Sequence, residues 1–284
     1  MKKAIFLGLV SLFIVGIKLT STAQVLEAPP RDGVYDKSAI VQMEPIPYVP
    51  LREADIIWSR RIWRTLDLRE KINQPFYYPI EPHNNWRSFV QILLDAMKEG
   101  TITAYSNSSD QFLYPITYKE LMDKLESPQR VTLKRPDNPE EEFDTIITKP
   151  FYASDVKYLR IKEDWVFDKQ RSVIEVRILG ICPVKDNYDE NGNYRGTEQL
   201  FWVYFPECRS IFAKNEQFNL RNGSAGRLSY DDVFIKRIFN SYIYKEENVY
   251  DRQIYEYAVG VDALLEAEKA KYSLHEFEQN LWEY

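Results

Sequence analysis

The sequence predicts an α+β fold in which amphipathic helices pack on a mainly antiparallel β-sheet. Two observations indicate this class. Apolar-rich runs between residues 155 and 205, with clear alternation at Ile174, Val176 and Ile178, are typical of the strands of a β-meander. The helical patterns lie before and after these runs rather than between them. A strict alternation of strands and helices would instead predict a parallel sheet. The chain has 284 residues, 44% hydrophobic with only 10 glycines, which excludes disordered and collagen-like classes.

The first 23 residues have the three parts of a secretory signal peptide. A cationic start, Met1-Lys2-Lys3, is followed by the uncharged and mostly apolar run Ala4–Ile17 and by small residues that end at Ala23. An uncleaved membrane anchor is the alternative, but a spanning helix needs about 20 apolar residues and this run is shorter. We therefore expect cleavage after Ala23 and an exported chain without a membrane span.

Residues 24–50 are predicted to form an extended, proline-rich arm. Prolines at positions 29, 30, 45, 47 and 50 fix φ and remove amide donors, which disfavours a packed sheet. The apolar side chains of this arm, Tyr35, Ile46 and Tyr48 among them, require burial on a neighbouring protein or on the chain's own domain. Residues 51–284 are predicted to form one α+β domain, with a subdivision near residue 150 as the alternative.

The segment Leu51–Lys71 is predicted to be a helix, because apolar residues recur every fourth position in it and Pro50 precedes it. Its other face is basic. The arginines of this face are Arg52, Arg60, Arg61, Arg64 and Arg69. They either pair with acids of the same chain or dock on an acidic patch of another subunit. As an interface hypothesis, we assign Arg52, Arg60, Arg61 and Arg64, together with the arm, to inter-subunit contacts.

The remaining elements follow from the same periodicities. Helices are predicted at Trp86–Glu99, Tyr118–Glu126, Tyr230–Phe239 and Val259–Glu283. Strands are predicted at Thr101–Tyr105, Gln111–Ile116, Val131–Leu133, Asp155–Phe167, Ser172–Val184 and Leu200–Phe205. Asp137–Asp144 and Asn219–Gly226 are predicted loops, and Glu207–Phe218 is predicted to be mixed helix and turn.

Residues typical of catalysis or cofactor binding are scarce. The net charge of −6 disfavours nucleic acid as a partner. His83 and His275 are far apart in polar surroundings, and the sequence contains neither a zinc-ligand spacing nor a phosphate-binding loop nor a nucleophile elbow. We therefore predict no enzyme activity, no cofactor and no catalytic residues.

One segment approaches the spacing of a calcium-binding loop. Its candidate ligands are Asn187, Asp189, Asn191 and Glu198. A neutral Asn at the first position and Arg195 within the loop both weaken such a site. Asn191-Gly192 between apolar runs also explains the segment as a β-hairpin turn, which is the interpretation that we favour.

The cysteines, Cys182 and Cys208, are compatible with one disulfide in an oxidising compartment. A hairpin about Asn191-Gly192 would place residue 182 opposite residue 201 rather than 208, so the register does not dictate the bond. The disulfide stays open at this point.

Several stretches resemble the gliding-motility protein GldN (PorN) family. They are Ile62–Pro79, Gly100–Tyr105 and Phe201–Pro206, which lie in the order expected for that family behind a signal peptide. The resemblance covers nearly the whole chain after residue 23. No single motif in it is chemically diagnostic, so its force lies in the joint arrangement.

The resemblance implies a non-enzymatic periplasmic component of the type IX secretion system of Bacteroidota. It implies self-association in a ring with a GldK/PorK-like outer-membrane lipoprotein, and contact with the periplasmic part of a GldM/PorM-like motor protein. It carries over no catalytic residues. The alternative from the residues alone is a periplasmic module that binds carbohydrate or peptide through exposed aromatic side chains.

Overall fold

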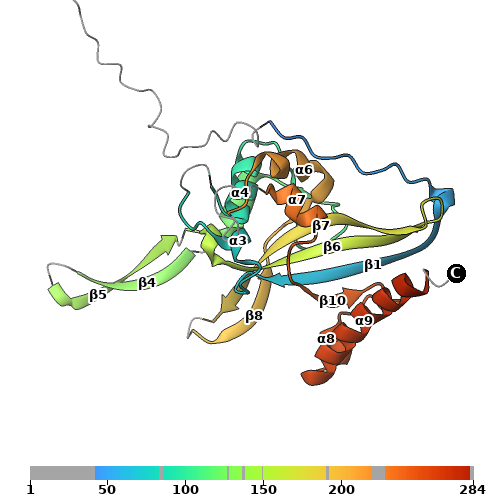
Figure 1. Ribbon diagram of the computed structural model, residues 1–284. Coiled ribbons are helices and arrows are strands. Elements are labelled where there is room, and N and C mark those ends of the chain that lie inside the picture. The colour runs from blue at the N-terminus through green and yellow to red at the C-terminus, as the bar shows by residue number, and fades with distance from the viewer. Residues whose placement is uncertain are drawn as a thin grey trace, which may run out of the picture. The chain divides into compact units, whose positions relative to one another are not determined.

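An eight-stranded antiparallel sheet organises the computed structural model, which describes residues 42–82, 86–126, 128–135, 138–148, 150–189, 192–218 and 228–281 (Figure 1). The strands run in the order β10-β1-β6-β7-β9-β2-β3, and β8 also pairs with β7. Their bounds are β1 Ile56–Asp67, β2 Ala104–Tyr105, β3 Pro115–Ile116, β6 Val156–Asp168, β7 Val173–Tyr188, β8 Tyr194–Gln199, β9 Trp202–Tyr204 and β10 Tyr242–Glu246. The helices and the antiparallel sheet confirm the α+β class.

The meander contains the longest strands of the sheet. β6 pairs with β7 from Val156↔Lys185 to Asp168↔Val173, and β7 continues into the hairpin with β8. Gly192 has φ of 78°, a left-handed conformation that favours glycine, and its amide donates to the Asp189 carbonyl. The predicted hairpin is thus confirmed.

The prediction of a helix over Leu51–Lys71 is wrong, because most of this segment is β1. Trp58, Ile62 and Leu66 are four residues apart, and a spacing of four is a multiple of the strand period of two as well as close to one helical turn. Ile56, Ile57, Trp63 and Thr65 are β-branched or aromatic and favour a strand. In the structure, β1 lies between β10 and β6, so its neighbours on both sides determine its conformation.

Of the described helices, α4, α5 and α7 begin at side-chain N-caps. The bounds of the helices are α3 Gln74–Tyr77, α4 Phe89–Lys98, α5 Tyr118–Leu125, α6 Phe205–Lys214, α7 Tyr230–Ile235, α8 Ile254–Tyr257 and α9 Val261–Asn280. Ser88 caps α4, while Thr117 and Ser229 form capping boxes with Glu120 and Asp232. Two short 3-10 turns, Glu53–Asp55 and Ala153–Asp155, precede β1 and β6.

Two apolar clusters share one face of the sheet. Along β1, Ile62, Arg64 and Leu66 alternate onto this face. Leu66 belongs to the main core, where the rings of Phe76, Phe89, Phe205, Phe212, Tyr230 and Phe234 from α3, α4, α6 and α7 pack together. Ile62 belongs to a second cluster with α8, α9 and β10. Figure 1 shows α8 and α9 beside β10.

A separate two-stranded sheet pairs β4 (Pro128–Arg135) with β5 (Asn138–Thr148). The predicted acidic loop Asp137–Asp144 is therefore wrong, because most of it is the first half of β5. The predicted strand Val131–Leu133 is confirmed and is longer than expected. α3, α8, β8 and β10 were not predicted.

The structure places β1 to β3 and β6 to β10 in one sheet, so strands from both sides of residue 150 pair with one another. The signal-peptide prediction, Tyr35, and the loop Asn219–Gly226 lie outside the described residues, as do the arm residues before 42.

Candidate interaction surfaces

The end of the arm lies on the chain's own domain. Tyr48 is half-buried between the guanidinium groups of Arg209 and Arg177, whose Cζ atoms lie 4.4 and 5.4 Å from the ring centroid. Burial raises the pKa of Tyr48, with the two arginines opposing that shift. Arg209 also donates to the Ile46 carbonyl at 2.6 Å, and Arg177 to the Val49 carbonyl at 2.6 Å. The Ile46 side chain itself remains 75% exposed.

The arginines of the interface hypothesis do not share one face, because β1 is a strand. Arg61 forms a bidentate pair with Asp164 at 2.7 and 2.9 Å. Arg60 points to the opposite face, where it donates to Ser273 Oγ at 2.8 Å and lies 3.7 Å from Glu246. Arg52 precedes the strand, is exposed and pairs with Asp55 at 2.7 Å. Arg60 and Arg61 are thus engaged within the chain, and Arg52 is the most accessible member of the set.

Arg64 is buried, in an ionic cluster that sequence reasoning missed. Glu163 on β6 is 0% exposed and accepts from Arg64 Nε and from both terminal nitrogens of Arg237, at 2.7 and 3.2 Å for the latter. Burial by itself would raise the pKa of Glu163, but Arg237 and Arg64 hold it below its ordinary value. The pKa of Arg64 is lowered by burial and by Arg237, against the attraction of Glu163.

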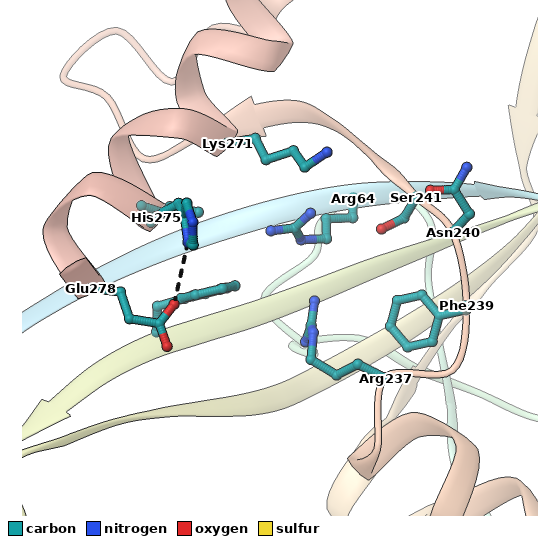
Figure 2. Close-up of a pocket in the computed structure, with 10 residues that line it drawn as sticks. Arg64, Arg237, Phe239, Asn240, Ser241, Lys271, His275 and Glu278 are labelled. Atoms are coloured by element: carbon teal, nitrogen blue, oxygen red, sulfur yellow. Dashed lines mark ion pairs between the residues drawn. The ribbon is translucent and has the colours of Figure 1, made fainter.

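A pocket of about 400 Å³ lies over this cluster. Figure 2 shows Arg64 and Arg237 on one side of it and Lys271 and His275 of α9 on the other. The rings of Trp165 and Phe239 also line it. His275 lies 3.8 Å from Glu278 on the same helix. The pocket combines aromatic rings with three cations, Arg64, Arg237 and Lys271, against one lining carboxylate, Glu278, and this excess of positive charge suits an anionic ligand.

Glu198 and Asp189, two of the four candidate calcium ligands, form salt bridges with other side chains. Glu198 lies 3.4 Å from Lys185 across the β7–β8 pair, and Asp189 lies 3.0 Å from Arg195. Asn187 is paired with Gly196 in the strand register, and Asn191 lies outside the described residues. In the described part of the chain, no three His, Cys, Asp or Glu side chains form a potential metal site.

Cys182 and Cys208 are both free and buried, so the structure does not contain the disulfide left open above. Cys182 lies in β7 with its pKa raised to about 12 by burial, and burial also raises the pKa of Cys208. The Cys208 thiol donates to the Tyr204 carbonyl at 3.2 Å. Thiolates form readily only when the pKa is low, so these thiols are unreactive in the folded chain.

Comparison with known protein families places residues 51–283 in the family described as "Gliding motility associated protein GldN". The chain belongs to the GldN family. Comparison with curated proteins gives no match. The GldN match begins at the residue after the predicted arm and covers the eight-stranded sheet together with α3 to α9.

The GldN domain of this chain exposes an apolar surface on α8 and α9. Its side chains, which we call the α8–α9 apolar surface, are Tyr255, Tyr257, Val259, Val261, Leu264 and Leu265, each between 47% and 81% exposed. Sequence reasoning missed it, although apolar residues on more than one face of the predicted helix were a signal for it. Several exposed apolar side chains on two neighbouring helices are a feature of protein-contacting surfaces.

The tryptophans of the described residues lie inside the GldN domain. Trp63 and Trp202 are buried, whereas Trp58, Trp86 and Trp165 are half-buried. Trp58 stacks on Phe277 of α9 with ring centroids 4.3 Å apart. Tryptophan rings packed in this way are not available as a row for sugar stacking, whereas several tyrosines, Tyr250 and Tyr255 among them, are exposed. None of the described helices is both long and apolar enough to cross a membrane.

Proposed function

We propose that the chain is a non-enzymatic, periplasmic component of the type IX secretion and gliding machinery. In this proposal it forms a ring with a GldK/PorK-like outer-membrane lipoprotein and contacts a GldM/PorM-like motor protein. The observation that carries the proposal is the GldN family match over residues 51–283. The predicted signal peptide supports export, and the exposed apolar side chains of α8 and α9 support a role in protein contacts.

The structure refines which residues suit a test of the interface hypothesis. Charge reversal at Arg61 or Arg64 would break pairs inside the chain, so its effects on binding and on folding would be confounded. The side chains of Ile46 and Arg52 are exposed. The salt bridge of Arg52 is to Asp55, three residues away and on the surface. Ile46 and Arg52 are therefore the informative positions.

We expect the double substitution Ile46→Asp and Arg52→Glu to reduce co-purification with the lipoprotein partner by about tenfold, the effect of roughly 1.4 kcal/mol at an interface. Tm should stay unchanged, because both side chains are exposed. Lys119→Glu, at an exposed position of α5, is the matched control. Light scattering of the mixture gives the assembly state. A wild-type chain that stays monomeric and never binds the lipoprotein would refute the proposed ring.

A further inference from the structure

The pocket over Glu163 contains more positive charge than its buried carboxylate compensates. Glu163 is the shared acceptor of two guanidinium groups, those of Arg64 and Arg237. Arg64 is only 6% exposed, and its pairing with described residues is through Nε to Glu163. Arg64 and Arg237 around Glu163 leave one positive charge in a weakly solvated place, where an incoming anion gains most. Glu278 also lines the pocket, and Lys271 in the same wall offsets its charge, so the net excess stays at one positive charge.

Arg237 has a backbone conformation that disfavours a side chain, which indicates that its guanidinium has a role at the pocket. Arg237 follows α7 with φ of 53°, and it occupies the C′ position of a Schellman motif: its amide bonds to the Phe234 carbonyl, and that of Ile238 to the Val233 carbonyl. Glycine is the usual residue at this position, since a side chain there costs about 1–2 kcal/mol. The chain nevertheless has an arginine, whose guanidinium lies at the pocket.

The other lining residues of the pocket add a third cation and two aromatic rings. Lys271 of α9 lines the pocket, and its salt bridge, to the exposed Glu268, is long at 3.7 Å. Arg64 and Arg237 each lie 5.6 Å from the centroid of the Trp165 ring, and Phe239 lies beside Arg237. Figure 2 shows the labelled cationic side chains around the same opening. An apolar body can therefore contact the rings while an anionic group reaches the cations.

We propose that this pocket binds a carboxylate group carried on an aromatic or apolar body. Arg64 pairs with Glu163 through Nε, so its terminal nitrogens are the donors for such a carboxylate, and the remaining N–H groups of Arg237 add to them. The charge also favours a monoanion, because a dianion beside Glu163 would exceed the uncompensated charge. The volume of about 400 Å³ lies within the range of small-ligand pockets. The carboxylate comes from a free small molecule or from the end of a peptide, and the two sources present the same group.

Calorimetric titration of the full chain without its signal peptide tests this proposal. The probes are benzoate, neutral benzamide, inorganic phosphate, and the peptide Gly-Gly-Phe with a free or an amidated C-terminus. Benzoate binding without benzamide binding supports a small carboxylate. Binding of the free peptide alone supports a peptide end. Phosphate binding that equals or exceeds both, or no carboxylate binding tighter than about 1 mM, overturns the proposal.

Two substitutions locate the binding. Arg237→Gln should weaken carboxylate binding about tenfold or more, as expected for the loss of a charge-assisted hydrogen-bond donor. Because that change also removes a partner of Glu163, Lys271→Glu on the surface of α9 serves as the second variant and should weaken binding at least threefold. Lys269→Glu, an exposed lysine of α9 that pairs with Glu266 and does not line the pocket, is the control. Equal affinity in the Lys271 and Lys269 variants would place the binding elsewhere.

Discussion

At the scale of single residues, Glu163 links β1, β6 and the residue Arg237 after α7. Its carboxylate is fully buried and joins an arginine of the strand beside it to Arg237, which is distant in sequence. Removing one partner of a buried ion pair leaves an uncompensated charge, and this typically costs about 3–5 kcal/mol. Glu163 is thus a more sensitive position than the many surface pairs of this chain.

We expect Glu163→Gln to lower the free energy of unfolding by about 3–5 kcal/mol in urea denaturation. Glu198→Gln is the matched control, because Glu198 is 46% exposed beside Lys185 and such pairs contribute only about 0–1 kcal/mol. Similar losses in the two variants would contradict this role of Glu163.

The same residue predicts a pH dependence of stability. The pKa of Glu163 is lower in the folded chain than its ordinary value, so the folded state binds the proton less well than the unfolded state does. The stabilisation is fully present above the unfolded pKa of about 4.3 and is lost as the pH falls through the folded pKa. Urea denaturation between neutral and acidic pH should show a steeper loss in the wild type than in Glu163→Gln.

The buried thiols give a second prediction at this scale. Cys182 and Cys208 should resist a thiol reagent such as dithionitrobenzoate in the folded chain and react together on denaturation, because burial keeps both protonated. The chain should also migrate identically with and without reductant in a denaturing gel. A reductant-dependent shift of the monomer would indicate a disulfide.

At the scale of elements, α9 buries few residues for a helix of 20 residues. Ala270 and Leu274 are its buried residues, and Phe277 adds a stack on Trp58 of β1. Phe277→Ala removes this stack and should increase deuterium uptake across residues 261–280 while β6 and β7 stay protected. Tyr272→Ala, at an exposed position of the same helix, is the control. Unchanged exchange in α9 would show that the stack does not anchor the helix.

Elements with an unambiguous local signal could be predicted from the sequence. An apolar-rich run predicted β6, alternation predicted β7, and Ser88 and Thr117 mark the starts of α4 and α5. β1 could not be identified in this way, because a four-residue apolar spacing satisfies both periods and only pairing with β6 and β10 decides between them. The pocket was also beyond prediction, since Arg64, Glu163, Arg237 and Lys271 meet only after the sheet and α9 have assembled.

At the scale of the whole molecule, the main core concentrates aromatic rings. Phe234 is 1% exposed. The centroid of its ring lies 5.3 to 6.0 Å from the ring centroids of Phe76, Phe89, Phe205, Phe212 and Phe239. We expect Phe234→Ala to lower the free energy of unfolding by about 3–5 kcal/mol, because it removes buried area and leaves a cavity. Phe234→Leu should cost less. Circular dichroism during urea denaturation gives both values, and a loss below about 1 kcal/mol for the alanine variant would argue against this core.

The order of strands also determines how sheets of neighbouring copies can meet. The edges of the eight-stranded sheet are β10, β3 and the outer side of β8. They are short, and they contain a lysine and a glutamate in β10, a proline in β3, and an arginine, a glycine and a glutamate in β8. Such borders resist backbone-to-backbone joining of sheets from different molecules. If copies of this domain associate through it, side chains on its faces and helices must therefore form the joint.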